Sequence, residues 1–225
     1  MVFVAGKVLS IIAILLLSLV AQYVGDFTSA LLRGKPRPAL HSFVDALADL
    51  FGQPSRDASQ RRASIIYLVT AFAALLCVPL GDLRAPADFE GDIFLFAAMI
   101  AGGDFATRRK GASLSFRYLA VWLLLAVSLA GMVLLTGSYS LSLQAVTLDG
   151  RPMAWIFAPI LLAAAWLYPR PPQYEGAALG RIELGAAFRR LAMAMLCAVP
   201  LGLSFIAACI VALAVAATKI VMSSE

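Results

Sequence analysis

Few side chains in this sequence could do chemistry on a substrate or hold a metal. The three cysteines, Cys77, Cys197 and Cys209, lie far apart and without the CxxC or CxxH spacing of a zinc or iron–sulfur site. His41 is the only histidine, and the sequence has no GxGxxG, P-loop or HExxH motif. We therefore expect no catalytic residue in this chain and no metal or cofactor bound by it.

Asp26 is the one ionisable side chain that we expect inside a long apolar segment. An ionisable group at membrane depth costs free energy and is generally kept for a function. Asp26 could line a functional polar chamber, or it could be a hydrogen-bonded residue at the membrane interface. A proton path across a bilayer needs several such groups, so the sequence does not favour a stand-alone proton antiporter.

The elements that position these residues are expected to be membrane helices. Of the 225 residues, 62% are apolar and 14% are charged, whereas soluble domains average about 45–50% and about 25%. The apolar runs approach the roughly 20 residues of a membrane-spanning helix. They are continuous, unlike the alternating strands of a membrane barrel. We predict an all-α polytopic integral membrane protein with a single membrane domain over residues 1–225.

The apolar runs predict about six transmembrane helices, near residues 8–31, 64–80, 93–103, 118–136, 153–167 and 191–217. The first is expected to be a retained helix and not a cleaved signal peptide. The third is short for a bilayer core of about 30 Å, so it either borrows residues 89–92 or is re-entrant. The last is long, and Pro200 and Gly202 are expected to kink it.

The connection between the first two spans predicts an amphipathic helix near residues 39–51. Its apolar residues recur at helical spacing on one stripe: Leu40, Phe43, Val44, Leu47, Leu50 and Phe51. The helix is too short and too polar on one face to cross a membrane. We expect it to lie at the cytoplasmic interface or against a neighbouring subunit. The two prolines of the preceding Arg33–Pro38 segment stiffen the backbone, which suits a docking loop.

Most of the basic residues fall on one side of the predicted membrane. With six spans, 14 of the 18 lysines and arginines lie on one side and 4 on the other. The positive-inside rule assigns the rich side to the cytoplasm and puts both termini on the outer side, in what we expect to be a bacterial inner membrane. Topology thus explains the net charge of +5 without a nucleic-acid partner.

The cytoplasmic loops supply the candidate contacts with a partner protein. These residues are Arg33, Lys35, Arg37, Asp45, Arg108, Arg109, Lys110, Arg170, Glu175 and Glu183. The basic string at residues 108–110 could instead bind anionic lipid or act only as a topology signal. Glu175 and Glu183 could be solvated residues or partners in salt bridges between subunits.

Five sequence segments, in order, resemble the NADH dehydrogenase subunit 1 family of respiratory complex I and of membrane-bound energy-converting hydrogenases such as formate hydrogenlyase. Asp45, within RGKPRPALHSFVDALADLF, matches an aspartate of the family's amphipathic helix. The other four segments are Gly103-Asp104 together with the Gly-Ala-Ser of residues 111–113, Gly137-Ser-Tyr-Ser-Leu-Ser142, Arg170-Pro-Pro172 and Tyr174-Glu-Gly176. The resemblance implies a membrane subunit of a multisubunit oxidoreductase.

The departures from the family pattern concern its membrane acids. Family members are usually longer and carry two membrane glutamates that are proposed to link a quinone or redox chamber to proton movement. Trp122 occupies the position of the first glutamate, and the position of the second falls near residues 166–168, where the chain has no acid. The resemblance therefore implies a non-catalytic anchor that lacks this coupling chemistry.

By this resemblance, the chain would dock the peripheral hydrogenase-like or dehydrogenase-like arm of an ion-translocating complex. Iron–sulfur clusters and a nickel–iron or quinone site would belong to partner subunits, and antiporter-like membrane subunits would move the ions. Lipids would surround the chain. Two other functions stay open: a small transporter or permease, and a membrane scaffold or assembly protein without a redox partner.

Overall fold

The computed structural model describes residues 2–32, 34, 57–81, 83–108, 115–169, 174 and 177–223. Within these ranges the chain is helical, and its only β-type pairing is an isolated bridge between Leu80 and Leu83. The helices are α1 (Val2–Leu32), α3 (Ala58–Cys77), α4 (Asp92–Thr107), α5 (Phe116–Thr136), α6 (Leu141–Leu148), η1 (Pro152–Ile156), α7 (Phe157–Leu167), α8 (Ala177–Ala198), η2 (Val199–Leu201) and α9 (Phe205–Ser223). The expected all-α class is confirmed.

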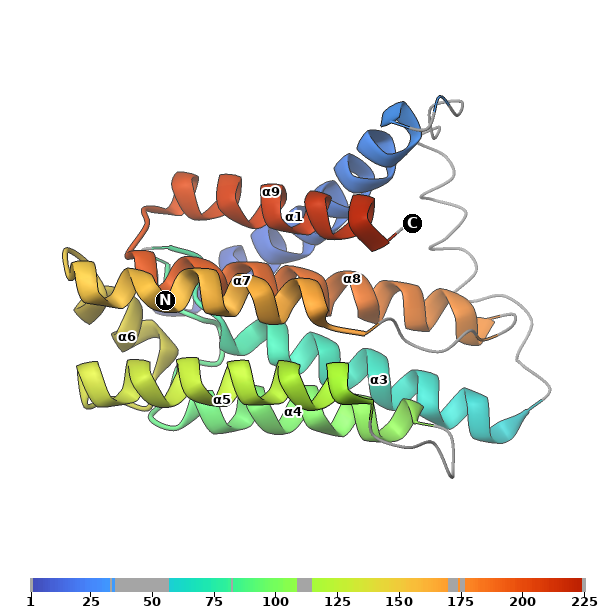
Figure 1. The fold of residues 1–225 in the computed structure, drawn as a ribbon, viewed down its shortest axis with the longest axis horizontal. Helices are drawn as coiled ribbons and strands as arrows, with labels where there is room; N and C mark the ends of the chain where they lie inside the picture. The colour runs from blue at the N-terminus through green and yellow to red at the C-terminus, as the bar shows by residue number, and fades with distance from the viewer. Residues whose placement is uncertain are drawn as a thin grey trace.

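The long helices form a bundle with α8 at its centre. Helix α8 packs on α3, α7, α9 and α1, while α4 packs on α3 and α5 packs on α7 (Figure 1). Every residue from Leu191 to Val199 is buried. Glycine and alanine are frequent in α8, and a side chain at Gly185 would collide with the Tyr67 ring of α3. Small residues thus let neighbouring helices approach closely, as in membrane bundles.

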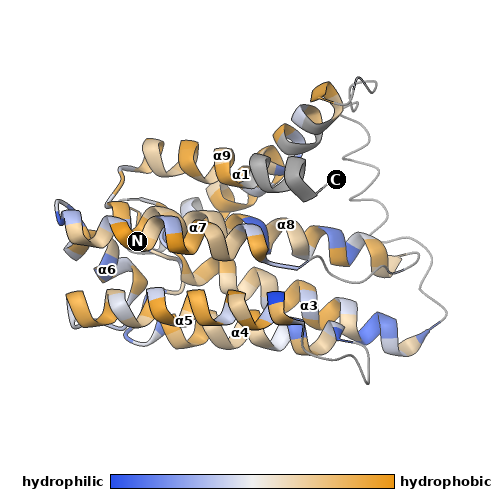
Figure 2. Cartoon of the chain, viewed as in Figure 1, coloured by the Kyte–Doolittle hydropathy of each residue, from blue (hydrophilic) through white to orange (hydrophobic). Residues whose placement is uncertain are grey.

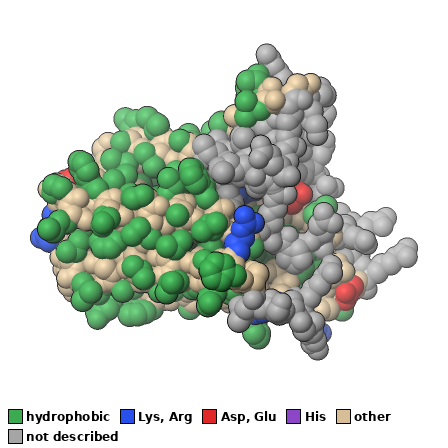
Figure 3. Space-filling model, in the orientation of Figure 1, with side chains coloured by type: hydrophobic (Ala, Val, Ile, Leu, Met, Phe, Trp, Pro, Cys, Tyr) green, Lys and Arg blue, Asp and Glu red, His purple; other side chains and the backbone are tan. Residues whose placement is uncertain are grey.

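Among the described residues, three helical segments are long and apolar enough to cross a membrane: Ala58–Cys77, Phe116–Thr136 and Ala177–Leu201. Shorter apolar stretches lie in Ser10–Val24, Pro152–Leu167 and Phe205–Val215. Apolar residues run along the middles of the helices, and hydrophilic residues gather toward their ends (Figure 2). Hydrophobic side chains also cover a broad stretch of the molecular surface (Figure 3). The chain therefore has the character of a membrane protein.

The last predicted span is two helices and not one kinked helix. Helix α8 ends in η2, and α9 then runs back along α8 and packs on α1 (Figure 1). Pro200 blocks continuation of the helix, and Gly202 takes a left-handed backbone conformation with φ of +57°. The expectation of one span over 191–217 was wrong because this pair makes a reversal where we expected a bend.

Other elements also differ from the sequence prediction, and α8 begins at Ala177, 14 residues before the predicted start of the last span. The third predicted span is extended at its C-terminal end, so that α4 includes Asp104 and ends at Thr107. The short helix α6 was not predicted. Ser140 caps its N-terminus by accepting a hydrogen bond from the Leu143 amide. The predicted amphipathic helix near 39–51 lies outside the described residues.

Candidate functional site: a buried ion pair at the basic end

Most of the arginines that the structure describes lie toward one end of the bundle. At this end α3, α5 and α8 begin and α4 and α7 finish (Figure 1). We call it the basic end; it carries Arg61, Arg62, Arg108, Arg117, Arg181, Arg189 and Arg190. The opposite end, where α4 begins and α5 finishes, carries Asp88, Glu90, Asp92 and Asp149, and we call it the acidic end.

Inside the basic end, Arg189 of α8 forms an ion pair with Asp104 of α4. The Arg189 side chain is 3% exposed and that of Asp104 is 11% exposed. Tyr168, directly after α7, donates its hydroxyl hydrogen to Asp104 and accepts a 2.7 Å hydrogen bond from Arg189 Nη1. These three side chains, the Asp104–Arg189–Tyr168 cluster, connect α4, α7 and α8 in the bundle interior.

Two further helices and a backbone carbonyl complete the surroundings of Arg189. Its Nη2 donates to the carbonyl of Ile100, one turn before Asp104, at 3.0 Å. Its guanidinium carbon lies 4.5 Å from the centre of the Tyr67 ring on α3, a cation–π contact. Tyr118 of α5 also lies close enough to Asp104 to interact with its charge. Five segments of the bundle therefore meet around one ion pair.

Opposite charges and hydrogen bonds compensate for the burial of the cluster. Burial raises the pKa of the Tyr168 phenol well above its ordinary value, so the hydroxyl stays protonated and donates a hydrogen bond to the Asp104 carboxylate. Breaking a buried pair by removing one partner typically costs about 3–5 kcal/mol, because the remaining charge is left without a partner in a dry interior. In the described part of the chain, Arg189 Nε finds no hydrogen-bond acceptor.

The sequence around the cluster explains its geometry. Gly103 precedes Asp104, and a methyl group at Gly103 would collide with the Arg189 guanidinium and with Thr70 of α3. On α8, Arg189 occupies a stripe of small and apolar residues at helical spacing that includes Ile182, Gly185, Ala192 and Leu196, all buried. The residue is therefore directed into the bundle and not toward the surface.

The acidic end holds a second polar arrangement. Glu90 accepts a 2.7 Å hydrogen bond from the Tyr139 amide, and Asp92 accepts a 2.8 Å bond from the Leu141 amide. Asp88 accepts a 3.1 Å bond from the Ser140 hydroxyl. These acids hold the turn between α5 and the N-terminus of α6, where backbone N–H groups lack helical partners. Their role is to fix the connection between α5 and α6.

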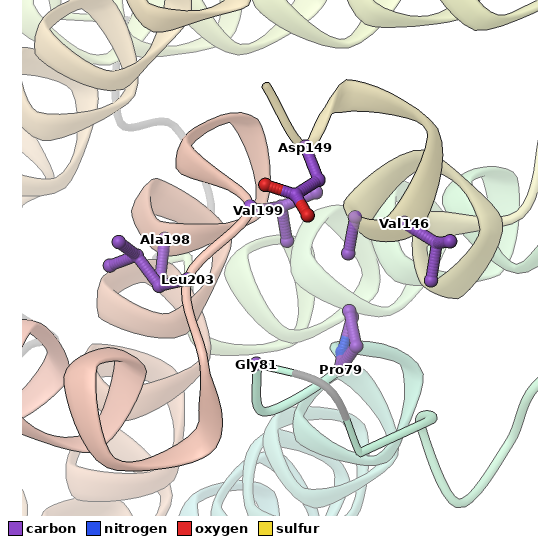
Figure 4. A pocket seen from close by; sticks show the side chains of 9 residues that line it. Pro79, Gly81, Val146, Asp149, Ala198, Val199 and Leu203 are labelled. Carbon is purple, nitrogen blue, oxygen red and sulfur yellow. The ribbon is translucent and has the colours of Figure 1, made fainter. Parts of the chain in front are cut away.

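A small cavity of about 130 Å³ lies at the same end, between α6 and the turn from α8 to α9 (Figure 4). Of the nine described residues that line it, Asp149 is the charged one. The others are apolar residues or glycines, such as Pro79 and Val199. A ligand site is expected to combine a concave surface with several converging polar groups, and this cavity offers one.

Most of the predicted docking residues lie outside the described ranges. These are Arg33, Lys35, Arg37, Asp45, Arg109, Lys110, Arg170 and Glu175. Arg108 and Glu183 are described, and both are exposed at the basic end. The backbone of Asp26 belongs to α1, but its side chain is outside what the structure describes. The docking role of these ten residues and the polar-chamber role of Asp26 stay predictions.

The sequence analysis missed the residues of the cluster. It placed Asp104 and Arg189 in cytoplasmic loops and expected Asp26 to be the only ionisable group within a span. The structure places Asp104 inside α4 and Arg189 inside α8, where both are largely buried. The helical stripe through Ile182, Gly185 and Ala192 was the signal that could have identified Arg189 as inward-facing.

Comparison with known proteins found no relative of this chain. No protein-family model matches the chain, and no curated protein matches it. The candidate function therefore depends on the bundle, the charge distribution and the buried cluster. Chemically, the cluster can lock helices together through its ion pair and its hydrogen bonds.

Proposed function

We propose that this chain is the membrane anchor of a multisubunit redox complex of the NADH dehydrogenase subunit 1 type. In this proposal a peripheral arm docks on the basic end from the cytoplasm. That arm would carry the iron–sulfur clusters and the nickel–iron or quinone site, and antiporter-like subunits would move the ions. The chain itself would supply attachment and no catalytic residue.

The observation that carries the proposal is the rigid support beneath the basic end. Arg61, Arg62 and Arg117 lie in the first turns of α3 and α5 and are exposed. In the bundle interior behind these arginines, the Asp104–Arg189–Tyr168 cluster holds α4 to α8. Helix α4 ends and helix α8 begins at the basic end. Arg190 adds a 2.6 Å hydrogen bond from α8 to Gln22 of α1. A docking surface on such a base keeps its shape when a partner binds.

The proposed topology follows from the helical hairpin of α8 and α9. If α1, α3, α4, α5, α7, α8 and α9 each cross, there are seven crossings and not the six expected from the sequence. The C-terminal end of α9 then joins the basic end, while the N-terminus lies at the other (Figure 1). The positive-inside rule places the basic end in the cytoplasm. We place the chain in a bacterial inner membrane.

Reversal of exposed charges at the basic end tests the docking role. We expect the variant R61E/R62E, purified in mild detergent at about 0.15 M salt, to lose its peripheral partner, since each reversal turns an attraction to an acidic partner surface into a like-charge repulsion. The control is Arg84→Glu, an exposed arginine near the acidic end. Equal retention of the partner by both variants would refute docking at the basic end.

The same purification separates the anchor from the two other functions. A wild-type chain that purifies without any peripheral redox protein, but drives solute uptake into vesicles, would be a transporter. A chain that binds membrane subunits only during assembly would be a scaffold. Association with subunits that carry iron–sulfur clusters is the result that the anchor proposal expects.

The buried cluster favours one addition to the anchor role, participation in proton movement. Asp104 and Tyr168 place a carboxylate and a phenol in contact in the bundle interior. Tyr168→Phe keeps the ring and removes the hydroxyl. If the cluster only locks helices, the assembled complex should pump ions per turnover as the wild type does. A lower ratio of ions to electrons in intact complexes would assign a proton to the cluster.

A further inference from the structure

An apolar groove follows the last turns of α5 at the acidic end of the bundle. One wall consists of Gly131, Leu134 and Leu135 of α5, and the other of Met153, Ile156 and Phe157 from η1 and the start of α7. The groove is shallow and has a volume of about 590 Å³. It is open along one side, and so it can receive an extended chain from outside the bundle.

The walls of this groove are unusually exposed for such apolar residues. Leu134 is 85% exposed, Met153 78% and Ile156 62%. A continuous apolar surface of this kind indicates contact with lipid or with another protein. The groove lies along α5, one of the helices long and apolar enough to cross the membrane. We therefore infer that these exposed side chains face the hydrocarbon of the bilayer.

Arg151 places a positive charge at the end of the groove. Arg151 directly precedes the wall formed by η1, and its Nη1 donates a 3.0 Å hydrogen bond to the carbonyl of Leu135 on the opposite wall. The side chain is exposed, and a guanidinium has five N–H donors. Asp149, the nearest acid in the sequence, packs against Gly202. Arg151 can thus present its charge to a headgroup at the mouth of the groove.

We propose that this groove binds one anionic phospholipid from the outer leaflet. An acyl chain would lie on the surface, over the contact between α5 and α7 and against the exposed side chains of Leu134 and Met153, and the lipid phosphate would accept hydrogen bonds from Arg151. The arginine fork matches a phosphate in shape as well as in charge. Trp155, half exposed on η1, suits the interface where headgroups meet hydrocarbon.

Native mass spectrometry of the full chain in detergent, titrated with phosphatidylglycerol, tests the headgroup contact. We expect Arg151→Gln to weaken retention of the first lipid by about tenfold, the scale of a charge-assisted hydrogen bond. Arg84→Gln removes the same charge at the same end and should leave retention unchanged. Equal effects of the two substitutions, or equal retention of phosphatidylcholine and phosphatidylglycerol by the wild type, would overturn the site.

Arg151 also caps the end of α5, so a second variant separates lipid binding from stability. Arg151→Lys keeps the charge. The two variants should have the same melting temperature, but Arg151→Lys should retain the lipid better than Arg151→Gln. If both variants melt early and lose the lipid equally, the capping bond explains the effect and the proposal fails.

Brominated phosphatidylglycerol tests the position of the acyl chain. Quenching of Trp155 fluorescence, measured as the difference between the wild type and Trp155→Phe, should be strong at a low lipid-to-protein ratio and weaker in Arg151→Gln. A crosslink from Met153→Cys to another protein chain in native membranes, without such quenching, would mean that a subunit covers the groove and would overturn the lipid site.

Discussion

Gly103 lies directly against the guanidinium group of Arg189, and a methyl group on this glycine would occupy the same space. The neighbouring Gly102 is different, since its added methyl group would meet only Thr70 Cγ2, at an ordinary 3.8 Å. Adjacent residues of one helix therefore differ in whether they can accept a side chain. The close approach of α4 and α8 depends on the first of them.

This pair gives a matched test of the packing around the cluster. We expect Gly103→Ala to lower the free energy of unfolding by about 1–3 kcal/mol, since Arg189 is held on several sides and cannot move away. Gly102→Ala should be neutral or stabilising, because alanine favours a helix more than glycine does. Unfolding of both variants in bilayers measures the difference. Equal stabilities would contradict the packing.

Replacement of both charges tests whether the ion pair itself is required. Arg189→Met alone should cost about 3–5 kcal/mol, because it leaves Asp104 buried without its cation. The double variant D104L/R189M should recover most of that loss, since apolar residues of similar volume can replace a buried pair. A double variant as unstable as the single one would mean that the charges also order the surrounding tyrosines.

The turn between α8 and α9 can be tested at Gly202. The left-handed backbone at Gly202 and at Gly137 disfavours any other residue, by about 1–2 kcal/mol. At Gly202 a methyl group would also come within 2.6 Å of the Asp149 backbone, whereas Gly137 has open space around it. We therefore expect Gly202→Ala to destabilise the protein clearly more than Gly137→Ala. Equal melting temperatures would argue against the close contact at the turn.

Reporter fusions test the proposed topology in bacterial cells. A cytoplasmic reporter attached after Glu225 should be active, and a periplasmic phosphatase inserted after Gly150 should also be active. The reason is that the hairpin returns α9 to the basic end. An active phosphatase after Glu225 would restore the single last span of the sequence prediction, with both termini outside.

The sequence predicted the helical class well, because apolar runs of spanning length leave few alternatives. It also located α5 to within two residues, since Ser115 and Gly137 mark its ends, whereas α3 begins six residues before the predicted span. The turn at Pro200 and Gly202 was visible as a break. Its geometry was not, because a kink and a reversal share the same residues and differ in how α9 packs on α1.

The buried cluster could not be read from hydropathy alone. Arg189 and Arg190 are adjacent and chemically identical, yet one is 3% exposed and pairs with Asp104, while the other bonds to Gln22 of α1. The helical stripe distinguishes them in principle. Their partners lie 85 and 168 residues away in the sequence, so only the folded bundle identifies them.

The central position of α8 sets a condition on how the protein is made. The helix carries Arg181 and Glu183 in its N-terminal half and Arg189 and Arg190 just beyond its midpoint, and a single arginine at a helix centre costs about 2.5–3.5 kcal/mol on insertion into lipid. The carboxylate that neutralises Arg189 belongs to α4, which the ribosome completes some 70 residues earlier. Helix α4 must therefore be retained near the site of synthesis, with Asp104 unmatched, until α8 arrives to close the bundle.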